Sequence, residues 1–391
     1  MSATNDTMKQ ISEYDQGRIE KILIIGAIGI GNLLLFSGTL RRIRRHFASA
    51  HITIIVLKEG FKALYENDPS VDEVLVLDVD KVKTFRQKIV FIWKMRKSRY
   101  QLCITTFPAN RIEYNLLAFF SGAKRRVAHK YAAKKLRSLS FLQNVRIPVE
   151  PELHDLEQNL NLLKAFGITP DDEDHRLFLN IPEQAHDNAR QYMKENDLYD
   201  KQLIGMHPGS SVERGMILKR WPSVYFAELC DWLTETIDAC ILLFGGKEEE
   251  RLREEIAVKT RHKSLIVTGL DLLSTASLIG KCALFVSNDS GLMHIAAAMG
   301  VQTIAIFGPT DPGRTAPYGQ EHRVIRTGTE CSPCWSINNL GVGTVRCIHP
   351  ENICLTELPV EMVKEVISSK LSTVIQKSKI NISQSRKERK E

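Results

Sequence analysis

The stretch Leu284-Phe-Val-Ser-Asn-Asp-Ser-Gly-Leu-Met-His-Ile-Ala-Ala-Ala-Met-Gly300 contains the pattern on which the fold assignment rests. A short apolar run predicts a buried strand, a small polar turn follows, and an Ala-rich run predicts a helix that ends at Gly300. The first N–H groups of such a helix lie unpaired at its positive end and suit a phosphate. The same turn also fits an ordinary N-cap in which Asp289 or Ser290 caps the helix.

Strand and helix patterns alternate outward from this stretch over the whole chain. In the first half, strands are predicted at 21–28, 51–57, 71–77 and 101–107, with helices at 33–47, 61–67, 84–99 and 151–168. In the second half, strands are predicted at 202–206, 239–244, 264–268, 283–287 and 303–307, with helices at 223–235 and 248–260. This alternation indicates two α/β units with parallel sheets and a boundary near residues 170–190.

Length and composition describe a globular protein of about two domains, with 391 residues, 43% hydrophobic and 25% charged. The longest apolar stretch, 283–307, is interrupted by Asn288, Asp289 and His294, and residues 1–16 lack the apolar core of a signal peptide. We therefore expect a cytoplasmic protein.

The net charge of +7 is concentrated in clusters at 41–45, 124–137 and 377–390. These clusters are either solvated helix faces with a disordered tail, or they attract an anionic phospholipid surface or an acidic acceptor. No nucleic acid is expected, because no zinc-finger, RRM-like or KH-like pattern occurs.

A second anion-friendly loop follows the strand predicted at 202–206. It contains Gly209, Ser210 and Ser211, and then Lys219-Arg220-Trp221-Pro222 before a helix. Lys219 or Arg220 could neutralise a diphosphate leaving group, although both would also suit a solvated surface loop. The turn Gly26-Ala-Ile-Gly-Ile-Gly-Asn32 has the wrong glycine spacing for a dinucleotide fingerprint. The turn after residue 307 presents Thr310, Asp311 and Arg314.

Four cysteines lie close together near the end of the chain. Cys331, Cys334, Cys347 and Cys354 have the spacing C-x2-C-x12-C-x6-C, which suits a structural zinc or iron site with four thiolates. The alternative is four reduced thiols in a surface flap.

Taken together, the motifs resemble those of glycosyltransferase family 9, the lipopolysaccharide heptosyltransferase-like enzymes, from about residue 21 to 366. The segments that carry the resemblance are Gly29-Ile-Gly-Asn32, Gly122-Ala-Lys-Arg-Arg-Val127, His154-Asp-Leu-Glu-Gln-Asn-Leu160, His207-Pro-Gly-Ser210, Lys219-Arg-Trp-Pro222, Gly245-Gly246, Ser287-Asn-Asp-Ser-Gly-Leu-Met-His294 and Phe307-Gly-Pro-Thr-Asp-Pro312. The resemblance implies a GT-B fold of two facing Rossmann-like domains, with a C-terminal helix crossing back to the first domain.

The resemblance also implies an activity. This is inverting transfer of a sugar, typically a heptose from an ADP-linked donor, to a lipopolysaccharide core or related cell-surface glycan, with no cofactor required. The partners would be a nucleotide-sugar donor, a lipid-linked glycan acceptor and an anionic membrane surface, at the inner face of the bacterial inner membrane. The donor-binding residues would be His207, Gly209, Ser210, Ser211, Lys219, Gly245, Glu248, Asp289, Ser290, Gly291, Leu292 and His294. Lys219 and the amides of residues 290–292 would hold the diphosphate, and Glu248 or Glu249 would contact the ribose.

One position departs from the family pattern. Many members carry Asp, the favoured general base, where this chain has Asn32, and an amide cannot accept a proton as a carboxylate can. Either Asp311 or Asp289 serves as the base and Asn32 positions the acceptor, or the chain is a weakened or non-catalytic sugar-nucleotide-binding homologue.

The expected organisation follows from these assignments. Residues 1–20 are expected to be disordered, 21–185 to form the acceptor-binding domain, and 186–358 the donor-binding domain with a Cys-rich flap at 331–354. Residues 359–376 would be the crossing helix and 377–391 a basic tail.

Overall fold

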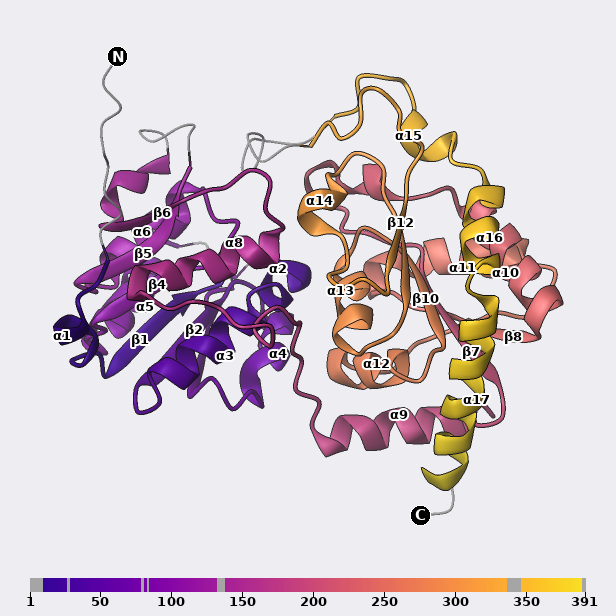
Figure 1. The fold of residues 1–391 in the computed structure, drawn as a ribbon, viewed down its shortest axis with the longest axis horizontal. Coiled ribbons are helices and arrows are strands. Elements are labelled where there is room, and N and C mark those ends of the chain that lie inside the picture. Colours follow the sequence, from indigo (N-terminus) through magenta and orange to yellow (C-terminus); the bar gives the residue numbers. More distant parts are fainter. Residues whose placement is uncertain are drawn as a thin grey trace. The chain divides into compact units, whose positions relative to one another are not determined.

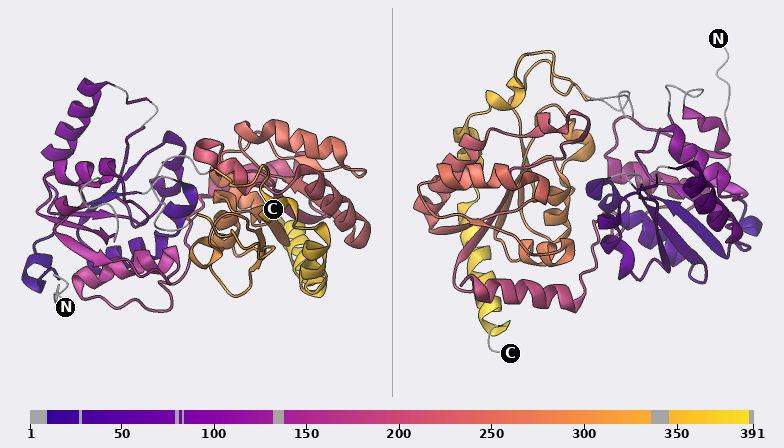
Figure 2. Two further views of the ribbon diagram at one scale, coloured as in Figure 1. Left: turned by 90° about the horizontal axis from the view of Figure 1, so that it is seen from above. Right: turned by 180° about the vertical axis from the view of Figure 1, so that it is seen from behind.

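The computed structural model describes residues 10–388 apart from 27–28, 79–80, 83, 132–137 and 336–345. Figure 1 shows two compact units, Met1–Asn180 and Ile181–Glu391, each built from a central sheet with helices around it. Figure 2 gives two further views of the same ribbon, in which each sheet again lies inside its own layers of helices. The division between the units lies at residues 180–181.

The first unit is a six-stranded parallel sheet in the order β3-β2-β1-β4-β5-β6. Its strands are β1 Lys21–Ile25, β2 His51–Val56, β3 Glu73–Val76, β4 Leu102–Thr105, β5 Arg125–Lys130 and β6 Val145–Pro148. Its longer helices are α3 Ser37–His46, α5 Phe85–Lys97, α6 Ile112–Phe120 and α8 Asp155–Asn161. The chain passes outward from β1 to β3 and returns to β4 on the other side of β1, as in a doubly wound fold.

The second unit repeats this arrangement with the order β12-β11-β10-β7-β8-β9. Its strands are β7 Gln202–His207, β8 Ala239–Leu243, β9 Leu265–Ile266, β10 Leu284–Asn288, β11 Thr303–Ile306 and β12 Arg323–Ile325. Its helices include α9 Glu183–Glu195, α10 Ser223–Ile237, α11 Glu250–Lys259, α12 Leu272–Ile279, α13 Gly291–Ala298 and α14 Pro312–Thr315. The opening stretch of sequence thus forms the central strand β10 and the helix α13.

The predicted α/β class with two parallel sheets is confirmed, and several elements add to the prediction. Strands β5, β6 and β12 and helices α6, α9 and α12 were not expected from the sequence. Strand β5 has the sequence Arg-Arg-Val-Ala-His-Lys, whose charged residues hide the apolar signal. Pairing with β4 and β6 on both sides nevertheless buries its centre. The helix expected at 33–47 divides into α2 Ile30–Leu34 and α3.

The expectation of disorder over residues 1–20 is wrong for residues 10–20. Ile11 is buried, its N–H donates to the carbonyl of Ala165 at 2.8 Å, and the short helix α1 Glu13–Gln16 follows. The Gln16 side chain donates to the carbonyl of Phe166 at 3.1 Å, and Asp15 forms an ion pair with Arg125. These contacts attach the segment to the first unit. Residues 1–9 lie outside the described residues.

The expectation of a disordered basic tail is also wrong up to residue 388. Helix α16 Val360–Ser368 is followed by α17 Leu371–Glu388, which continues through the basic stretch. Val374, Ser378 and Ser385 are buried at the helical spacing of one face. The Asn381 amide donates to the carbonyl of Lys281 at 2.9 Å, and Lys377 Nζ donates to that of Gly300 at 3.1 Å. The strongest packing of α16 is against α10, and that of α17 is against β7, so these contacts of the C-terminal helices lie within the second unit.

Candidate functional site

The carboxyl ends of the two central strands of the second sheet define the site. Strands β7 and β10 are adjacent and parallel, with Ser287 aligned to His207, so the loops that follow them begin side by side. Loops at this edge of a parallel sheet are where ligands bind. The two segments that the sequence predicts to bind an anion, the loops after β7 and β10, therefore lie at the same edge of the second sheet.

Helix α13 begins where β10 ends. Ser290 is its N-cap, and the Ser290 hydroxyl oxygen accepts a hydrogen bond from the N–H of Met293 at 3.4 Å. The N-cap interpretation is therefore correct. It is compatible with an anion site, because a single cap leaves other N–H groups of the first turn without a helical acceptor.

An ion pair links this helix start to the neighbouring loop. Lys219 Nζ lies 2.7 Å from Asp289 Oδ2, and both side chains are largely buried, with 15% and 7% of their surface exposed. Lys219 Nζ also lies 5.2 Å from the centre of the Trp335 ring. The ammonium group is thereby placed beside the positive end of α13, with its charge balanced by Asp289.

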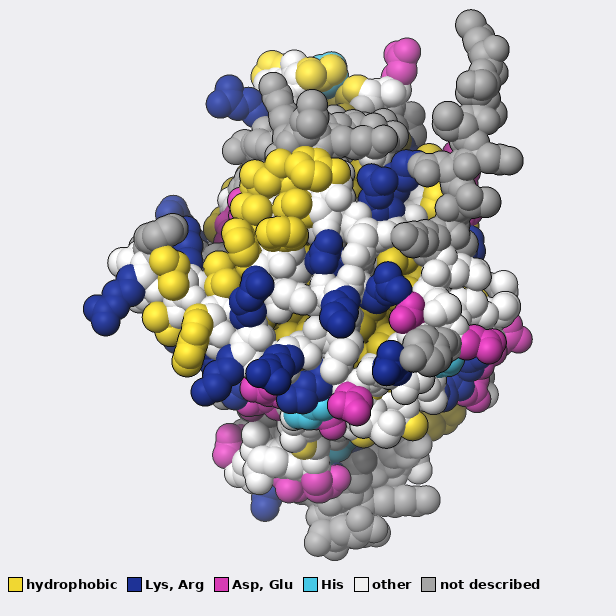
Figure 3. All heavy atoms as spheres, turned by 90° about the vertical axis from the view of Figure 1, so that its left-hand side faces the viewer, with side chains coloured by type: hydrophobic (Ala, Val, Ile, Leu, Met, Phe, Trp, Pro, Cys, Tyr) yellow, Lys and Arg dark blue, Asp and Glu magenta, His cyan; other side chains and the backbone are white. Residues whose placement is uncertain are grey.

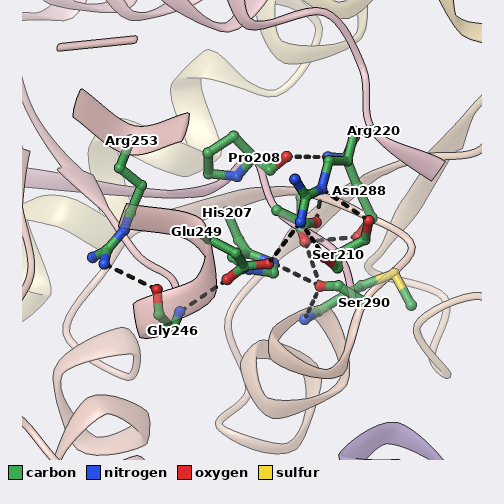
Figure 4. A network of polar contacts seen from close by, with 12 residues as sticks. His207, Pro208, Ser210, Arg220, Gly246, Glu249, Arg253, Asn288 and Ser290 are labelled. Carbon is green, nitrogen blue, oxygen red and sulfur yellow. Dashed lines mark hydrogen bonds and ion pairs between the residues drawn. The ribbon is translucent and has the colours of Figure 1, made fainter. Parts of the chain in front are cut away.

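A hydrogen-bonded chain of three side chains connects the loops after β7, β8 and β10 (Figure 4). His207 Nε2 lies 3.1 Å from Glu249 Oε2, and its Nδ1 lies 2.8 Å from Ser290 Oγ. An ionised carboxylate only accepts, so the ring donates through Nε2. Nδ1 makes the hydrogen bond with the Ser290 hydroxyl.

Glu249 is the buried carboxylate in this series of hydrogen-bonded side chains. Burial opposes its ionisation, but the charge and hydrogen bond of His207, the Gly246 N–H at 2.8 Å and the charge of Arg220 outweigh that cost. Together they hold the pKa of the Glu249 carboxyl below its usual value. A β-carbon added at Gly209 would lie 1.9 Å from Glu249 Oε1, so only glycine fits against the carboxylate. Gly209 therefore lets the loop after β7 pack directly against the Glu249 carboxylate.

The loop after β7 is held in shape by further polar contacts. Arg220 donates to the carbonyl and, at 3.2 Å, to the hydroxyl of Ser210, and Ser210 donates to the carbonyl of Met216 at 2.9 Å. The Asn288 amide donates to the carbonyl of Pro208 at 2.6 Å and accepts from the N–H of Trp221 at 3.1 Å. Arg220 and Ser210 are thus committed to loop structure, and Lys219 is the cation directed at α13.

The other residues that the sequence predicted for the site are either packed beside the start of α13 and Glu249, or at least partly exposed and engaged in local structure. His294 is buried on α13, and Gly291 and Leu292 form the first turn of that helix. Gly245 lies in the turn after β8 with a φ of 157° and borders Glu249. Ser211 and Glu248 are exposed, and the Ser211 hydroxyl accepts a local hydrogen bond from the N–H of Glu213 at 3.2 Å. Asp311 caps the short helix α14 by accepting from the N–H of Gly313 at 2.9 Å.

The sequence offers Glu249 and Arg220 only as alternatives to Glu248 and Lys219, and it does not indicate a role for Asn288. Of the two adjacent glutamates, Glu249 is the buried one. The signal that could have found it is the spacing of a capping box, since Glu249 reaches back three residues to the N–H of Gly246.

In the first unit, the turn after β1 presents Asn32. Gly29 has a φ of 110° and precedes α2, and Asn32 lies half-buried in the first turn of that helix. The amide of Asn32 lies 3.5 Å from the position that a β-carbon at Gly29 would occupy.

The four late cysteines line one small pocket of about 60 Å³. All four are free thiols. Within the part of the chain that the structure describes, no three His, Cys, Asp or Glu side chains are arranged to hold a metal ion.

The family comparison identifies the class of protein that this fold and site define. The model of glycosyltransferase family 9 (heptosyltransferase) matches residues 91–341, more than half of the chain. The chain belongs to glycosyltransferase family 9, and it is a glycosyltransferase. The chain is 26% identical over 320 residues to lipooligosaccharide heptosyltransferase 2 of Haemophilus ducreyi, covering 78% of this chain and 88% of that protein. It is 25% identical over 316 residues to lipopolysaccharide heptosyltransferase 2 of Escherichia coli, with the same coverage.

Solved structures confirm the GT-B fold. A family 9 glycosyltransferase from Veillonella parvula matches with a TM-score of 0.70 and 21% identity over 91% of this chain and 97% of that chain. The E. coli ADP-heptose lps heptosyltransferase II matches with a TM-score of 0.68 and 23% identity over 91% of this chain and 99% of that chain.

The hydrogen bonds that link Glu249, His207 and Ser290 predict that the stability of the fold depends on pH. Because the pKa of Glu249 is lowered in the folded protein, its ionised form stabilises the fold above its unfolded pKa. That contribution is lost as the pH falls through the folded value. Glu249→Gln should therefore lower the free energy of unfolding by about 1–3 kcal/mol at neutral pH, and the difference should shrink below about pH 4.

Denaturant unfolding of both proteins at neutral and acidic pH measures this difference. Glu248→Gln is the matched control, because Glu248 is exposed beside Glu249. An equal loss of stability at both pH values would show that Glu249 acts through packing and not through its charge.

Proposed function

We propose that this chain transfers a heptose, with inversion, from ADP-heptose to a lipopolysaccharide core or a related cell-surface glycan. The observation that carries the proposal is the Lys219–Asp289 pair at the start of α13, beside the buried Glu249–His207–Ser290 chain. Two relatives are named for heptose transfer to lipopolysaccharide or lipooligosaccharide. One matching structure, of E. coli heptosyltransferase WaaC, is a complex with ADP.

In this proposal the second unit binds the donor and stabilises its leaving group. The diphosphate lies at the N-terminus of α13, where the N–H groups of residues 290–292 donate to its oxygens. Lys219 exchanges its contact with Asp289 for the diphosphate and neutralises the charge that develops as the glycosidic bond breaks. Asp289 and His294 then face the sugar. This chemistry requires no cofactor.

The general base is proposed to be one of two carboxylates, with Asn32 in a positioning role. Asn32 holds the acceptor hydroxyl through its amide, and Asp311 or Asp289 accepts the proton. Asp311 Oδ1 accepts from the N–H of Gly313 and Asp289 Oδ2 from Lys219, and each carboxylate keeps a second oxygen that can accept a proton. No finding favours a non-catalytic or weakened homologue.

The acceptor is proposed to be lipid-linked, and the protein to work at an anionic membrane surface, on the cytoplasmic face of the bacterial inner membrane. The basic character of the first unit supports this location. Among the described helices, none is both long and apolar enough to cross a bilayer. Association would therefore be peripheral.

We propose in addition that Cys331, Cys334, Cys347 and Cys354 hold a structural zinc or iron ion. Their shared pocket supports this, because four thiols that border so small a space need only local shifts to reach one ion. The ion would link the loop after β12, which carries Cys331 and Cys334, to the start of α15 Ile353–Thr356. It would take no part in sugar transfer.

Removing the Lys219 charge tests the donor site. Lys219→Ala should weaken binding of ADP-heptose about ten- to hundredfold, because a charge-assisted hydrogen bond to phosphate is lost. Calorimetry with the donor, and release of ADP in the presence of a truncated core acceptor, measure binding and transfer. Lys201→Ala is the control on the exposed surface. Wild-type protein that neither binds ADP-heptose nor releases ADP would overturn the proposed function.

The proposed role of Asn32 is tested by comparing the donor affinity and the transfer rate of an Asn32 variant. Asn32→Ala should reduce the rate of transfer about tenfold or more and leave donor affinity unchanged, since Asn32 lies in the first unit, which is proposed to bind the acceptor. Steady-state kinetics with varied acceptor measures this change. Transfer at the wild-type rate would remove Asn32 from the mechanism.

The cysteine site is tested by metal content. Protein purified without added metal should contain about one zinc or iron ion per chain, and the double variant Cys331→Ser, Cys347→Ser should contain none and melt at a lower temperature. Cys240→Ser, which lies outside the pocket, is the control. Elemental analysis that finds neither metal in the wild type would contradict the proposal.

A further inference from the structure

The charge of the chain is concentrated in one segment of the first unit. Residues 81–149 contain 17 Lys and Arg residues and one acidic residue, Glu113. The segment carries +16, whereas the whole chain carries +7, so the rest of the chain has a net charge of −9. Glu113 itself pairs with Arg111 at 2.9 Å. A positive charge this concentrated attracts anions to the surface that α5 and α6 form.

Helix α5 exposes an apolar stripe within this positive surface. Ile89, Val90 and Trp93 are 49%, 57% and 64% exposed, and they occupy neighbouring turns of one helix face. Met95 on the opposite side is buried in the sheet core. Lys88, Lys94, Arg96 and Lys97 flank the stripe, and no acidic residue occurs in the helix. Among the described residues, no ion pair joins these four cations to a carboxylate.

Helix α6 and the adjoining 3-10 turn η2 Ser140–Leu142 extend the apolar surface. Phe119, Phe120 and Phe141 are exposed there, and both α5 and η2 pack against α6. The described part of the chain has 15 large hydrophobic side chains that are more than a third exposed. Its only Phe and Trp members are these three and Trp93. Figure 3 shows this side of the molecule, with hydrophobic and basic side chains intermixed over its face.

Cations and aromatic rings are paired on this surface. Lys97 Nζ lies 5.3 Å from the centre of the Trp93 ring, and the Arg126 guanidinium lies 5.6 Å from that of Phe119. Trp beside Lys or Arg is the combination found at membrane–water interfaces, where the ring enters the headgroup layer and the cation meets phosphate.

An open pocket lies beside the exposed end of α5. It has a volume of about 860 Å³ and is lined by Trp93, Arg96, Lys97, Arg99 and Lys21, together with Glu20, Ser98 and Gln101. Four cations against one carboxylate suit a phosphate-bearing headgroup. Lys21 begins β1 and Gln101 precedes β4, so the pocket lies at the amino edge of the sheet, opposite the edge at which Asn32 follows β1. Occupation of the pocket would leave the Asn32 turn uncovered.

We infer that the face formed by α5, α6 and η2 is the membrane-docking surface of this protein, and that its partner is an anionic phospholipid bilayer. Trp93, Val90, Phe119 and Phe120 enter the headgroup layer, and a lipid phosphate occupies the pocket beside Arg96 and Lys97. Exposed aromatic side chains favour a bilayer over a purely polyanionic partner, since polyanions offer no apolar layer. This inference deepens the peripheral membrane association proposed above.

Sedimentation of the full chain with lipid vesicles tests the surface. The wild type should bind vesicles of phosphatidylcholine mixed with phosphatidylglycerol at least about tenfold more tightly than vesicles of phosphatidylcholine alone, and salt should weaken that binding. Arg96→Glu with Lys97→Glu should weaken it by about fivefold or more for each charge. Val90→Ser with Trp93→Ser should weaken binding comparably, even at low salt.

Matched controls come from the second unit. Val258→Ser, at a side chain that is 85% exposed, and Lys263→Glu should leave vesicle binding unchanged. Trp93 also provides a direct signal, because its fluorescence should shift to the blue on vesicle binding, and this shift should be absent from Trp93→Phe. Binding that responds to the charge variants but not to the serine variants would overturn the inference in favour of a general polyanion surface. Equal binding to neutral vesicles would overturn it as well.

A transfer assay with a water-soluble acceptor separates this inference from the proposed function. The serine variants should transfer sugar to that acceptor at the wild-type rate while losing vesicle binding. Wild type that binds vesicles but transfers nothing would count against the proposed function alone. Wild type that transfers sugar but does not bind anionic vesicles would count against the docking surface alone.

Discussion

The burial of the Glu249 carboxylate is the constraint on which the arrangement of the site depends. A buried charge needs partners, and this one obtains them from three loops, through His207 after β7, Gly246 after β8, and Ser290 by way of the histidine. Gly209 has no side chain because the carboxylate occupies that space. The same contacts fix the start of α13 and bring the Lys219 loop against it.

The two units share a topology but differ in charge and chemistry. In the second unit, the buried polar side chains of the site are hydrogen-bonded to one another in the loops that follow β7, β8 and β10. The first unit carries the surplus of positive charge on the outside, over α5 and α6, where aromatic side chains are also exposed. An enzyme that takes a water-soluble donor and a lipid-linked acceptor, as proposed here, requires both properties in one chain.

The sequence identified the elements whose apolar runs are continuous. Strands β1, β2, β7, β8, β10 and β11 were all predicted, because buried parallel strands are apolar on both faces. Strand β5 was missed because its arginines, its histidine and its lysine interrupt that pattern. Residues 377–388 of helix α17 were predicted as a disordered tail because Ser378 and Ser385 do not look like core residues, although both lie buried along the helix face that contains Val374.

The sequence by itself determined the class of protein and the motifs at the helix start, because Lys219, Asp289 and Ser290 lie in short segments whose chemistry can be read locally. Only the tertiary structure decided which side chains those motifs use. Glu249 and Glu248 are adjacent and chemically identical, and burial against Gly209 and His207 distinguishes them. Lys219 and Arg220 are likewise neighbours, yet one contacts Asp289 and the other the Ser210 loop. Such choices depend on residues distant in sequence, which come together only when the sheet aligns β7 with β10.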